Sequence, residues 1–429
     1  MKSFILLFLL VFSIHAFAQF NPDVIQSDVV QYAKRQSFDK YLRETVIGKT
    51  FHEPLDSNSE FYYESACLAI SQFMIASDIV KRGFDSLYLH YDSLQYSTKR
   101  AFIEAVYSIY PNAYSDWFKQ LITKETEPKL FCMQAVYLYK NDSSKQNIQQ
   151  LERQLKKNFG ANDTLLLLQL LKSYLDNEQG YKQKKLPDLN KLFAYRKASG
   201  SATVYSFQRW NRDYPGIALV QNPDGCFARD SAGHVLMFQQ LARSASNMPY
   251  FISSGNTPQG IYSIWKTANS INKIIGPSPN LQTVLPFEDD SLYWRGKYDY
   301  SKDALRNYIG LLPLEWQNYL PMMEAFNAGK AGRNEIIAHG TTIDPEYFKG
   351  KPYYPLSPTL GCLCGKETWN MYTGKIVQSD QLDLVNTFIK ENEEETGLLF
   401  VIDLDNQQKP VTKREIEKMV DTFEYNSHL

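Results

Sequence analysis

The fold of this chain changes most clearly at residues 217–229, IALVQNPDGCFAR. Residues 217–221 are apolar enough for a strand, residues 222–225 form a strong turn sequence, and residues 226–229 run back. Two extended runs joined by a tight turn predict an antiparallel hairpin. Before about residue 203 the apolar residues instead recur with a helical period, so we expect a helical part followed by a mainly β part.

The helical part is expected at 19–175, where apolar residues lie three and four apart between short polar or Pro/Gly-bearing turns. The pattern predicts helices at 98–110, 114–123, 129–139 and 144–158. Their similar lengths favour stacked antiparallel pairs, as in helical-repeat domains, although the sequence has no fixed repeat signature. Residues 176–202 are polar and contain Pro187, and are expected to be a linker with one short helix at 189–195.

The β part is expected at 203–429. Further extended segments at 235–242, 250–253 and 260–265 continue an antiparallel meander. The stretch 270–334 has no strand pattern and is expected to be an inserted subdomain or a lid. Beyond it we expect a helix at 381–391, a buried strand at 397–403 and a closing helix at 412–423. The predicted fold class is therefore α + β multidomain.

Composition and charge narrow the class of protein. With 429 residues and 44% hydrophobic residues, the chain is long enough for more than one core. Its 46 basic and 47 acidic residues give a net charge of -1, which removes the electrostatic reason to expect nucleic acid.

The first residues resemble an export signal. Lys2 precedes the apolar run 4–12, and Ala16-Phe17-Ala18 is a small-x-small cleavage site. We expect residues 1–18 to be a cleaved signal peptide, with an uncleaved anchor as the alternative. The mature chain has no stretch near the roughly 20 apolar residues that a transmembrane helix needs.

The five cysteines point to a reactive thiol. They are widely spaced, and an odd number leaves at least one thiol unpaired in an oxidising compartment. Cys362 directly follows Gly361 in residues 357–364, SPTLGCLC, a loop with little helix or strand propensity. Upstream, residues 336–341, IIAHGT, form a short apolar strand that ends in His339-Gly340.

Cysteine and histidine together suit acyl transfer. A thiol attacks an acyl carbon only as thiolate, and a nearby imidazole can take its proton and return it to a leaving amine. Gly361 lets backbone N–H groups near the sulfur turn toward the oxyanion of a tetrahedral intermediate. The two residues are 23 apart (362 − 339), and the Gly/Pro-rich segment between them is expected to fold back.

These residues resemble the L,D-transpeptidase catalytic domain family of bacterial peptidoglycan remodelling. The resemblance rests on three ordered pieces: the hairpin TPQGIY at 257–262, His339-Gly340, and Thr359-Leu360-Gly361-Cys362. It covers roughly residues 203–429. It implies that a cysteine attacks the amide between an L-centre and a D-residue of a stem peptide, releases the D-residue, and passes the acyl group to an amine or water.

The resemblance also assigns roles. Cys362 would be the nucleophile, His339 the base, and a main-chain carbonyl beside His339 would orient the ring. Oxyanion or supporting roles fall to neighbours of the two, namely Gly340, Thr341, Thr359, Leu360 and Gly361. Substrate contacts are expected from Tyr354, Cys364 and Trp369.

Two features depart from the family pattern. The family usually has arginine two residues after the nucleophile, where this chain has Cys364. A positive charge for the substrate is therefore missing from its usual place. The insertion at 270–334 is the second departure, and it would reshape the acyl-acceptor side.

Alternative readings of the site remain. Cys362, Cys364 and His339 lack the fourth ligand that a structural zinc site needs, so we expect neither metal nor cofactor. Cys364 can instead cap Cys362 as a labile disulfide, or Cys362 can be an inert buried cysteine.

The expected function is that of a periplasmic acyltransferase on peptidoglycan stem peptides, with the helical domain binding a protein or glycan partner. The alternatives are an L,D-carboxypeptidase or amide hydrolase on the same substrates, and a cell-wall binding protein whose site has decayed.

Overall fold

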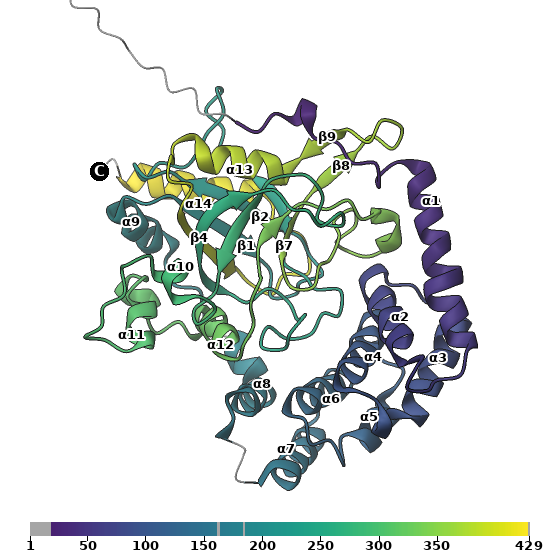
Figure 1. Ribbon diagram of the computed structural model, residues 1–429. Helices are drawn as coiled ribbons and strands as arrows, with labels where there is room; N and C mark the ends of the chain where they lie inside the picture. Colours follow the sequence, from purple (N-terminus) through teal and green to yellow (C-terminus); the bar gives the residue numbers. More distant parts are fainter. Residues whose placement is uncertain (1–18, 161–163, 183–184, 428–429) are drawn as a thin grey trace, which may run out of the picture.

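The computed structural model describes residues 19–160, 164–182 and 185–427. A helical N-terminal part lies beside a part built on a closed β-barrel (Figure 1). The chain is thus an α + β protein with the predicted order of its two parts. The signal peptide expected at 1–18 lies outside the described residues. None of the described helices is both long and apolar enough to cross a membrane.

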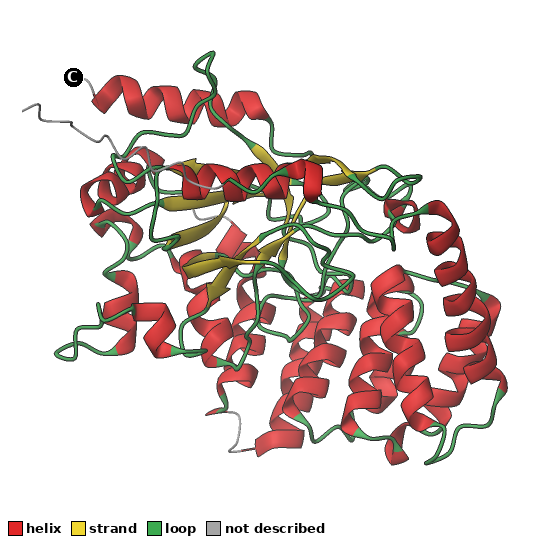
Figure 2. Ribbon diagram, turned by 45° about the horizontal axis from the view of Figure 1, so that its top comes forward, coloured by secondary structure: helices red, strands yellow, loops and turns green. Residues whose placement is uncertain are grey.

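The N-terminal part is a stack of helices, which Figure 2 shows packed side by side. They are α1 (Tyr32–Lys40), continued by a π-helix at Tyr41–Lys49, then α2 (Glu60–Phe73), α3 (Asp78–Leu89), α4 (Tyr96–Ile109), α5 (Ser115–Leu121), α6 (Pro128–Asn141), α7 (Lys145–Phe159) and α8 (Leu166–Lys182). The four predicted helices are confirmed as α4 to α7, within two residues at each end.

The positions of α6 and α7 in this stack follow from their sequences. Helix α6 begins with Pro128 at its first turn, where a missing N–H costs nothing, and all of residues 130–139 are buried. It is therefore the central helix of the stack. Helix α7 is amphipathic: Ser144 caps its first turn, and Leu151, Leu155 and Phe159, four residues apart, are its buried side chains.

The second part is a closed eight-stranded barrel with the strand order β1-β10-β4-β5-β6-β7-β3-β2. The pairs β1–β10 and β6–β7 are parallel and the others antiparallel. The strands are β1 (Thr203–Gln208), β2 (Gly216–Gln221), β3 (Phe238–Leu241), β4 (Gly260–Ala268), β5 (Asn280–Val284), β6 (Ala338–His339), β7 (Leu363–Gly365) and β10 (Gly397–Asp403); β8 (Glu367–Trp369) and β9 (Ile376–Ser379) form a separate ribbon.

Helices cover the barrel on two sides. Helix α13 (Asp380–Lys390) contributes Leu384 and Phe388 to the core that also holds Val204 of β1. The next residue of β1, Tyr205, belongs to a second core together with α9 (Leu189–Ser199) and α14 (Lys413–Ser427). Because both faces of β1 and β10 are covered, every residue of these strands is buried.

Three expectations for this part need correction. The stretch 270–334 is not free of strands, since it contains barrel strand β5 followed by α10 (Asp290–Trp294), α11 (Ala304–Ile309) and α12 (Glu324–Lys330). Residues 250–253 form turns rather than a strand. The expected linker includes α9, which is no loose connector, because Leu192 and Phe193 are fully buried in the barrel's outer core.

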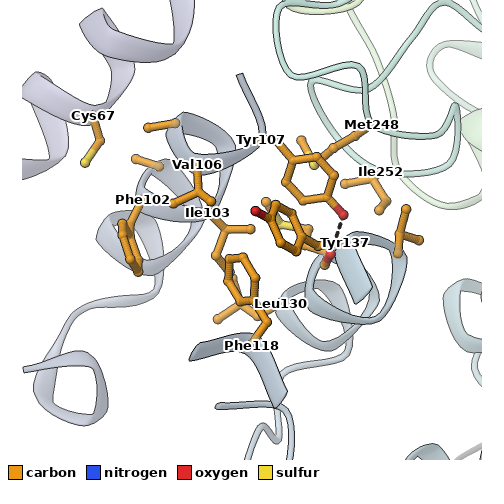
Figure 3. Close-up of a cluster of buried hydrophobic side chains, with 14 of the residues drawn as sticks. Cys67, Phe102, Ile103, Val106, Tyr107, Phe118, Leu130, Tyr137, Met248 and Ile252 are labelled. Atoms are coloured by element: carbon orange, nitrogen blue, oxygen red, sulfur yellow. Dashed lines mark hydrogen bonds between the residues drawn. The ribbon is translucent and has the colours of Figure 1, made fainter. Parts of the chain in front are cut away.

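The helical stack and the barrel share one hydrophobic core. Strand β3 contributes Leu241 to the cluster formed by α2 to α8, and the segments between the barrel strands contribute Met248, Phe251, Ile252, Ile343, Phe348, Tyr353 and Leu356. Figure 3 shows Met248 and Ile252 beside Tyr107 of α4 and Tyr137 of α6. Polar contacts join the same surfaces: Arg35 pairs with Asp344 at 3.3 Å, and Lys129 Nζ donates to Ser253 Oγ at 3.0 Å. The stack therefore supports the loops at one end of the barrel.

Candidate functional site

His339 ends strand β6, and Cys362 directly precedes the neighbouring strand β7, at this end of the barrel. Strands β6 and β7 pair in parallel, with Ala338 opposite Leu363 and His339 opposite Cys364. Ala338 and Leu363 both face the barrel core. Since side chains alternate along a strand, His339 and Cys364 face the opposite side.

The sulfur of Cys362 is held against the backbone just before His339. The Ile337 N–H donates to Sγ at 3.5 Å, and the Sγ–H donates to the Glu335 carbonyl at 3.4 Å. Neither bond joins the thiol to His339, but Ile337 is only two residues from His339 in the same extended segment.

The surroundings of Cys362 keep its thiol protonated. Burial raises the pKa of Cys362 to about 11, against the lowering effects of the Ile337 N–H and the Arg333 charge. The carboxylates of Glu335 and Glu288 raise the pKa further. Cys362 is nevertheless only half-buried, so part of the residue is accessible to solvent. A protonated thiol of this kind needs a base before it can attack an acyl group.

His339 is in the neutral form that a base requires. Its side chain is only 5% exposed, and burial lowers the pKa of His339, partly offset by the carbonyl of Gly340. That carbonyl lies 2.5 Å from Nδ1. With Nδ1 donating to the carbonyl, Nε2 is left as the unprotonated nitrogen. The ring is therefore oriented by a main-chain carbonyl, and its free nitrogen can accept a proton.

Glu367 holds the His-Gly turn in place. Its Oε2 accepts from the Thr341 N–H at 2.8 Å, and its Oε1 accepts from Ser379 Oγ at 2.7 Å. Burial raises the pKa of Glu367 to about 7. A β-carbon at Gly340 would lie 2.1 Å from the carboxyl carbon of Glu367. Glycine is therefore needed at 340 so that this carboxyl group can reach the turn.

The Gly-Cys loop is fixed by two threonines. Thr359 Oγ1 accepts from the Gly361 N–H at 3.0 Å and donates to the Cys362 carbonyl at 2.8 Å. Thr257, from the loop before β4, donates through Oγ1 to the Gly361 carbonyl at 2.9 Å. The three sequence pieces quoted above therefore meet in space.

The Cys362 N–H is the candidate donor to an oxyanion in this loop. Because Thr359 already takes the Gly361 N–H, that group is not available to an oxyanion. The Cys362 N–H donates to no acceptor among the described residues. Gly361, at φ +122°, contributes the backbone conformation that turns the next peptide outward.

Sequence reasoning missed Arg333, a buried arginine beside this loop. Its Nη1 donates to the carbonyls of Tyr250 and Asn256, and its Nη2 donates to the Gly255 carbonyl at 3.0 Å. Burial lowers the pKa of Arg333 to about 10, and its charge acts on Cys362. A positive charge thus lies near Cys362 although position 364 is a cysteine. Its place in the Gly-Arg-Asn sequence 332–334 gives no local signal of this role.

The other candidate residues differ in accessibility. Leu360, two residues before Cys362, is 49% exposed, and Tyr354 is 40% exposed with its hydroxyl donating to Glu346 at 2.7 Å. Cys364 is fully buried. Trp369 is also buried, packs with Ile25 of the N-terminal segment, and donates through Nε1 to the Thr341 carbonyl at 2.9 Å. Trp369 therefore supports the His-Gly turn in this structure, and its contact with a substrate stays a prediction.

All five cysteines are free thiols: Cys67, Cys132, Cys226, Cys362 and Cys364. No group of three or more His, Cys, Asp or Glu side chains in the described part of the chain is arranged to hold a metal ion. No family model, curated protein or solved structure matches this chain.

Proposed function

We propose that this protein is a cysteine acyltransferase of the L,D-transpeptidase type that acts on peptidoglycan stem peptides in the periplasm. The observation that carries the proposal is the meeting of three separate sequence pieces around one thiol. Thr257 binds Gly361, the Cys362 sulfur lies against residues 335–337, and Gly340 orients His339. A merely structural cysteine requires none of these arrangements.

The chemistry starts from two neutral groups. When a substrate carbonyl displaces the Glu335 contact, His339 Nε2 takes the thiol proton and Sγ bonds to the amide carbon. The Cys362 N–H then stabilises the oxyanion. The C–N bond breaks, the imidazolium gives its proton to the leaving amine of the D-residue, and a thioester remains. An acceptor amine attacks the thioester, returns the acyl group to an amide, and frees the thiol.

The charges around the thiol favour an amine as the acceptor. Glu335 is exposed, and its carboxylate acts on Cys362 electrostatically. A cationic amine is attracted to such a carboxylate before it loses its proton and attacks. This supports transfer over hydrolysis as the main reaction. L,D-carboxypeptidase activity is the second candidate, favoured by the absence of arginine at position 364.

The helical stack would serve the reaction as a support. Loop residues Met248 and Ile252 pack on it, while Tyr250, Gly255 and Asn256 of the same loop bind Arg333 beside Gly361. The stack is thereby connected to the nucleophile loop through one arginine. Recruitment of a protein or glycan partner by its outer surface remains part of the proposal.

Product analysis tests the proposal. The mature chain is incubated with tetrapeptide-bearing muropeptides, with and without an amine acceptor, and the products are identified by mass spectrometry. We expect release of the terminal D-residue, a cross-linked or amine-exchanged product with the acceptor, and neither product with Cys362→Ala. Release without transfer would indicate the carboxypeptidase, and identical products from Cys362→Ala and wild type would refute the assignment.

A further inference from the structure

A cavity apart from the Cys362 site is lined by residues of α9, α10 and α11, three helices that lie near one another on one side of the barrel (Figure 1). Its volume is about 480 Å³, and its walls come from the end of α9, from α10 and α11 with the loop between them, and from Leu398 of β10. The size is typical of a small-molecule site. None of the residues discussed for the Cys362 site lines it.

The lining of this cavity is strongly basic. Its charged residues are Arg196, Arg295, Lys297, Lys302, Arg306 and Asp299. Five cations and one anion give a local charge of +4 (5 − 1), in a chain whose net charge is -1. The one acidic group, Asp299, is already paired with Lys302 at 2.8 Å, and Arg306 lies 3.9 Å from Asp303, which is outside the lining. Positive charge is therefore concentrated here far beyond what the composition requires.

Arg196 is buried in the cavity wall without an acidic partner. It is 5% exposed, donates through Nε to Thr203 Oγ1 at 3.2 Å, and lies over the Phe400 ring at 5.7 Å. It forms no ion pair with any carboxylate in the described part of the chain. Burial lowers the pKa of Arg196, and the charge of Arg295 lowers it further.

Arg295 is a second arginine of the cavity wall that has no ion pair among the described residues. It is half-buried at φ +47°, and its Nη2 donates to the Gly397 carbonyl at 3.3 Å. Its Nε is buried with no hydrogen-bond partner. The carboxylate that acts on it most, Glu394, forms no ion pair within 4 Å among the described residues. Removing two like charges from water costs free energy unless an anion binds between them.

We propose that this cavity binds a small phosphorylated ligand, whose phosphate is held by Arg196 and Arg295. Guanidinium groups bind phosphate oxygens in a two-pronged geometry. A phosphate monoester carries a charge of about -1.5 to -2 near neutral pH and three acceptor oxygens, which matches two arginines better than one carboxylate does. Lys297 and Arg306, on the rim, hold a second anionic group when the ligand has one.

Titration calorimetry of the mature chain tests the proposal. Pyrophosphate and inorganic phosphate are compared with citrate at matched ionic strength, so that phosphate and carboxylate binding are distinguished. We expect one pyrophosphate per chain, weaker binding of phosphate, and at least tenfold weaker binding of citrate. No heat with pyrophosphate, or citrate binding as tight as pyrophosphate, would overturn the proposal.

Substitutions locate the binding. Arg295→Gln should weaken pyrophosphate binding at least tenfold, and Arg306→Gln on the exposed rim should weaken it two- to fivefold without any effect on folding. Arg414→Gln, which removes an exposed positive charge on α14, should leave affinity within twofold of wild type. Circular dichroism checks that each variant is folded. Unchanged affinity in both cavity variants would show that the ion binds elsewhere and refute the site.

Discussion

The guanidinium of Arg333 lies directly against the backbone of Gly361, where a β-carbon would be 2.3 Å from Nη2. The same guanidinium binds three carbonyls of residues 250–256. A buried arginine therefore joins the loop 250–256 to the residue that precedes Cys362. Position 361 therefore needs glycine for two reasons: its positive φ, and the lack of space for a β-carbon beside Arg333.

Replacement of Arg333 should affect both stability and reactivity. We expect Arg333→Met to lower the free energy of unfolding by about 3–5 kcal/mol, because three buried carbonyls lose their donor. Arg333→Lys keeps the positive charge but loses the branched guanidinium group. Its free energy of unfolding should lie between those of wild type and Arg333→Met. Urea unfolding measures the stability, and the rate of Cys362 acylation measures the reactivity. Arg414→Met, at an exposed position, is the control. A stable Arg333→Met protein with normal acylation would contradict this role.

The thiol of Cys362 should react as a protonated group at neutral pH. Because burial raises the pKa of Cys362 to about 11, its thiolate fraction rises about tenfold per pH unit between pH 7 and 10. Iodoacetamide alkylation, mapped by mass spectrometry, should follow that slope. Buried Cys67 and Cys132 should remain unlabelled in the same samples. A rate for Cys362 that is flat from pH 6 to 9 would instead indicate a preformed thiolate–imidazolium pair.

Gly340→Ala should disrupt the His-Gly turn. The new methyl group would collide with the Glu367 carboxyl group, and overpacking of this kind typically costs about 1–3 kcal/mol. Acylation of Cys362 should fall at least tenfold, because the Gly340 carbonyl that orients His339 moves. The double variant Gly340→Ala, Glu367→Ala removes the collision. Its loss of stability should therefore be smaller than the sum of the losses in the two single variants. Strict additivity would refute the proposed contact.

The shared core should couple the helical stack to the barrel. Ile252 is fully buried in that core, so Ile252→Ala should cost about 2–5 kcal/mol. It should still unfold in one transition. Ile271→Ala, at a fully exposed position, provides the matched control and should change stability by less than about 0.5 kcal/mol. Two separate unfolding transitions, with the barrel unaffected by Ile252→Ala, would show that the parts are independent.

Local periodicity was enough to predict much of the fold. Strand β10 has the predicted bounds of 397–403, and α4 to α7 were expected within two residues. Strand β5 was missed because its five residues, NLQTV, mix polar and apolar positions and follow a Gly/Pro-rich stretch. Strand β5 is defined by its pairing with β4 and β6. Such pairing depends on residues outside the segment, so a local sequence pattern does not predict it.

The candidate site was predictable only where a motif marks it. The segments that carry the two motif residues are neighbours, because β6 ends at His339 and pairs with β7, which Cys362 directly precedes; the contact between the thiol and the imidazole stays a prediction. Arg333 and Glu367 were not found, because their importance depends on burial against Gly361 and Gly340. A charged residue in an unremarkable sequence context reveals such a role only through three-dimensional packing.

The most direct test of the account is the intact mass of the protein after incubation with a carbapenem, an acylating probe for sites of this type. We predict a single covalent adduct on Cys362 of the wild-type chain, none on Cys362→Ala, and strongly slowed formation on His339→Ala. A wild-type chain that stays unmodified, or an adduct that persists in Cys362→Ala, would contradict the claim that this thiol and imidazole form an acyl-transfer site.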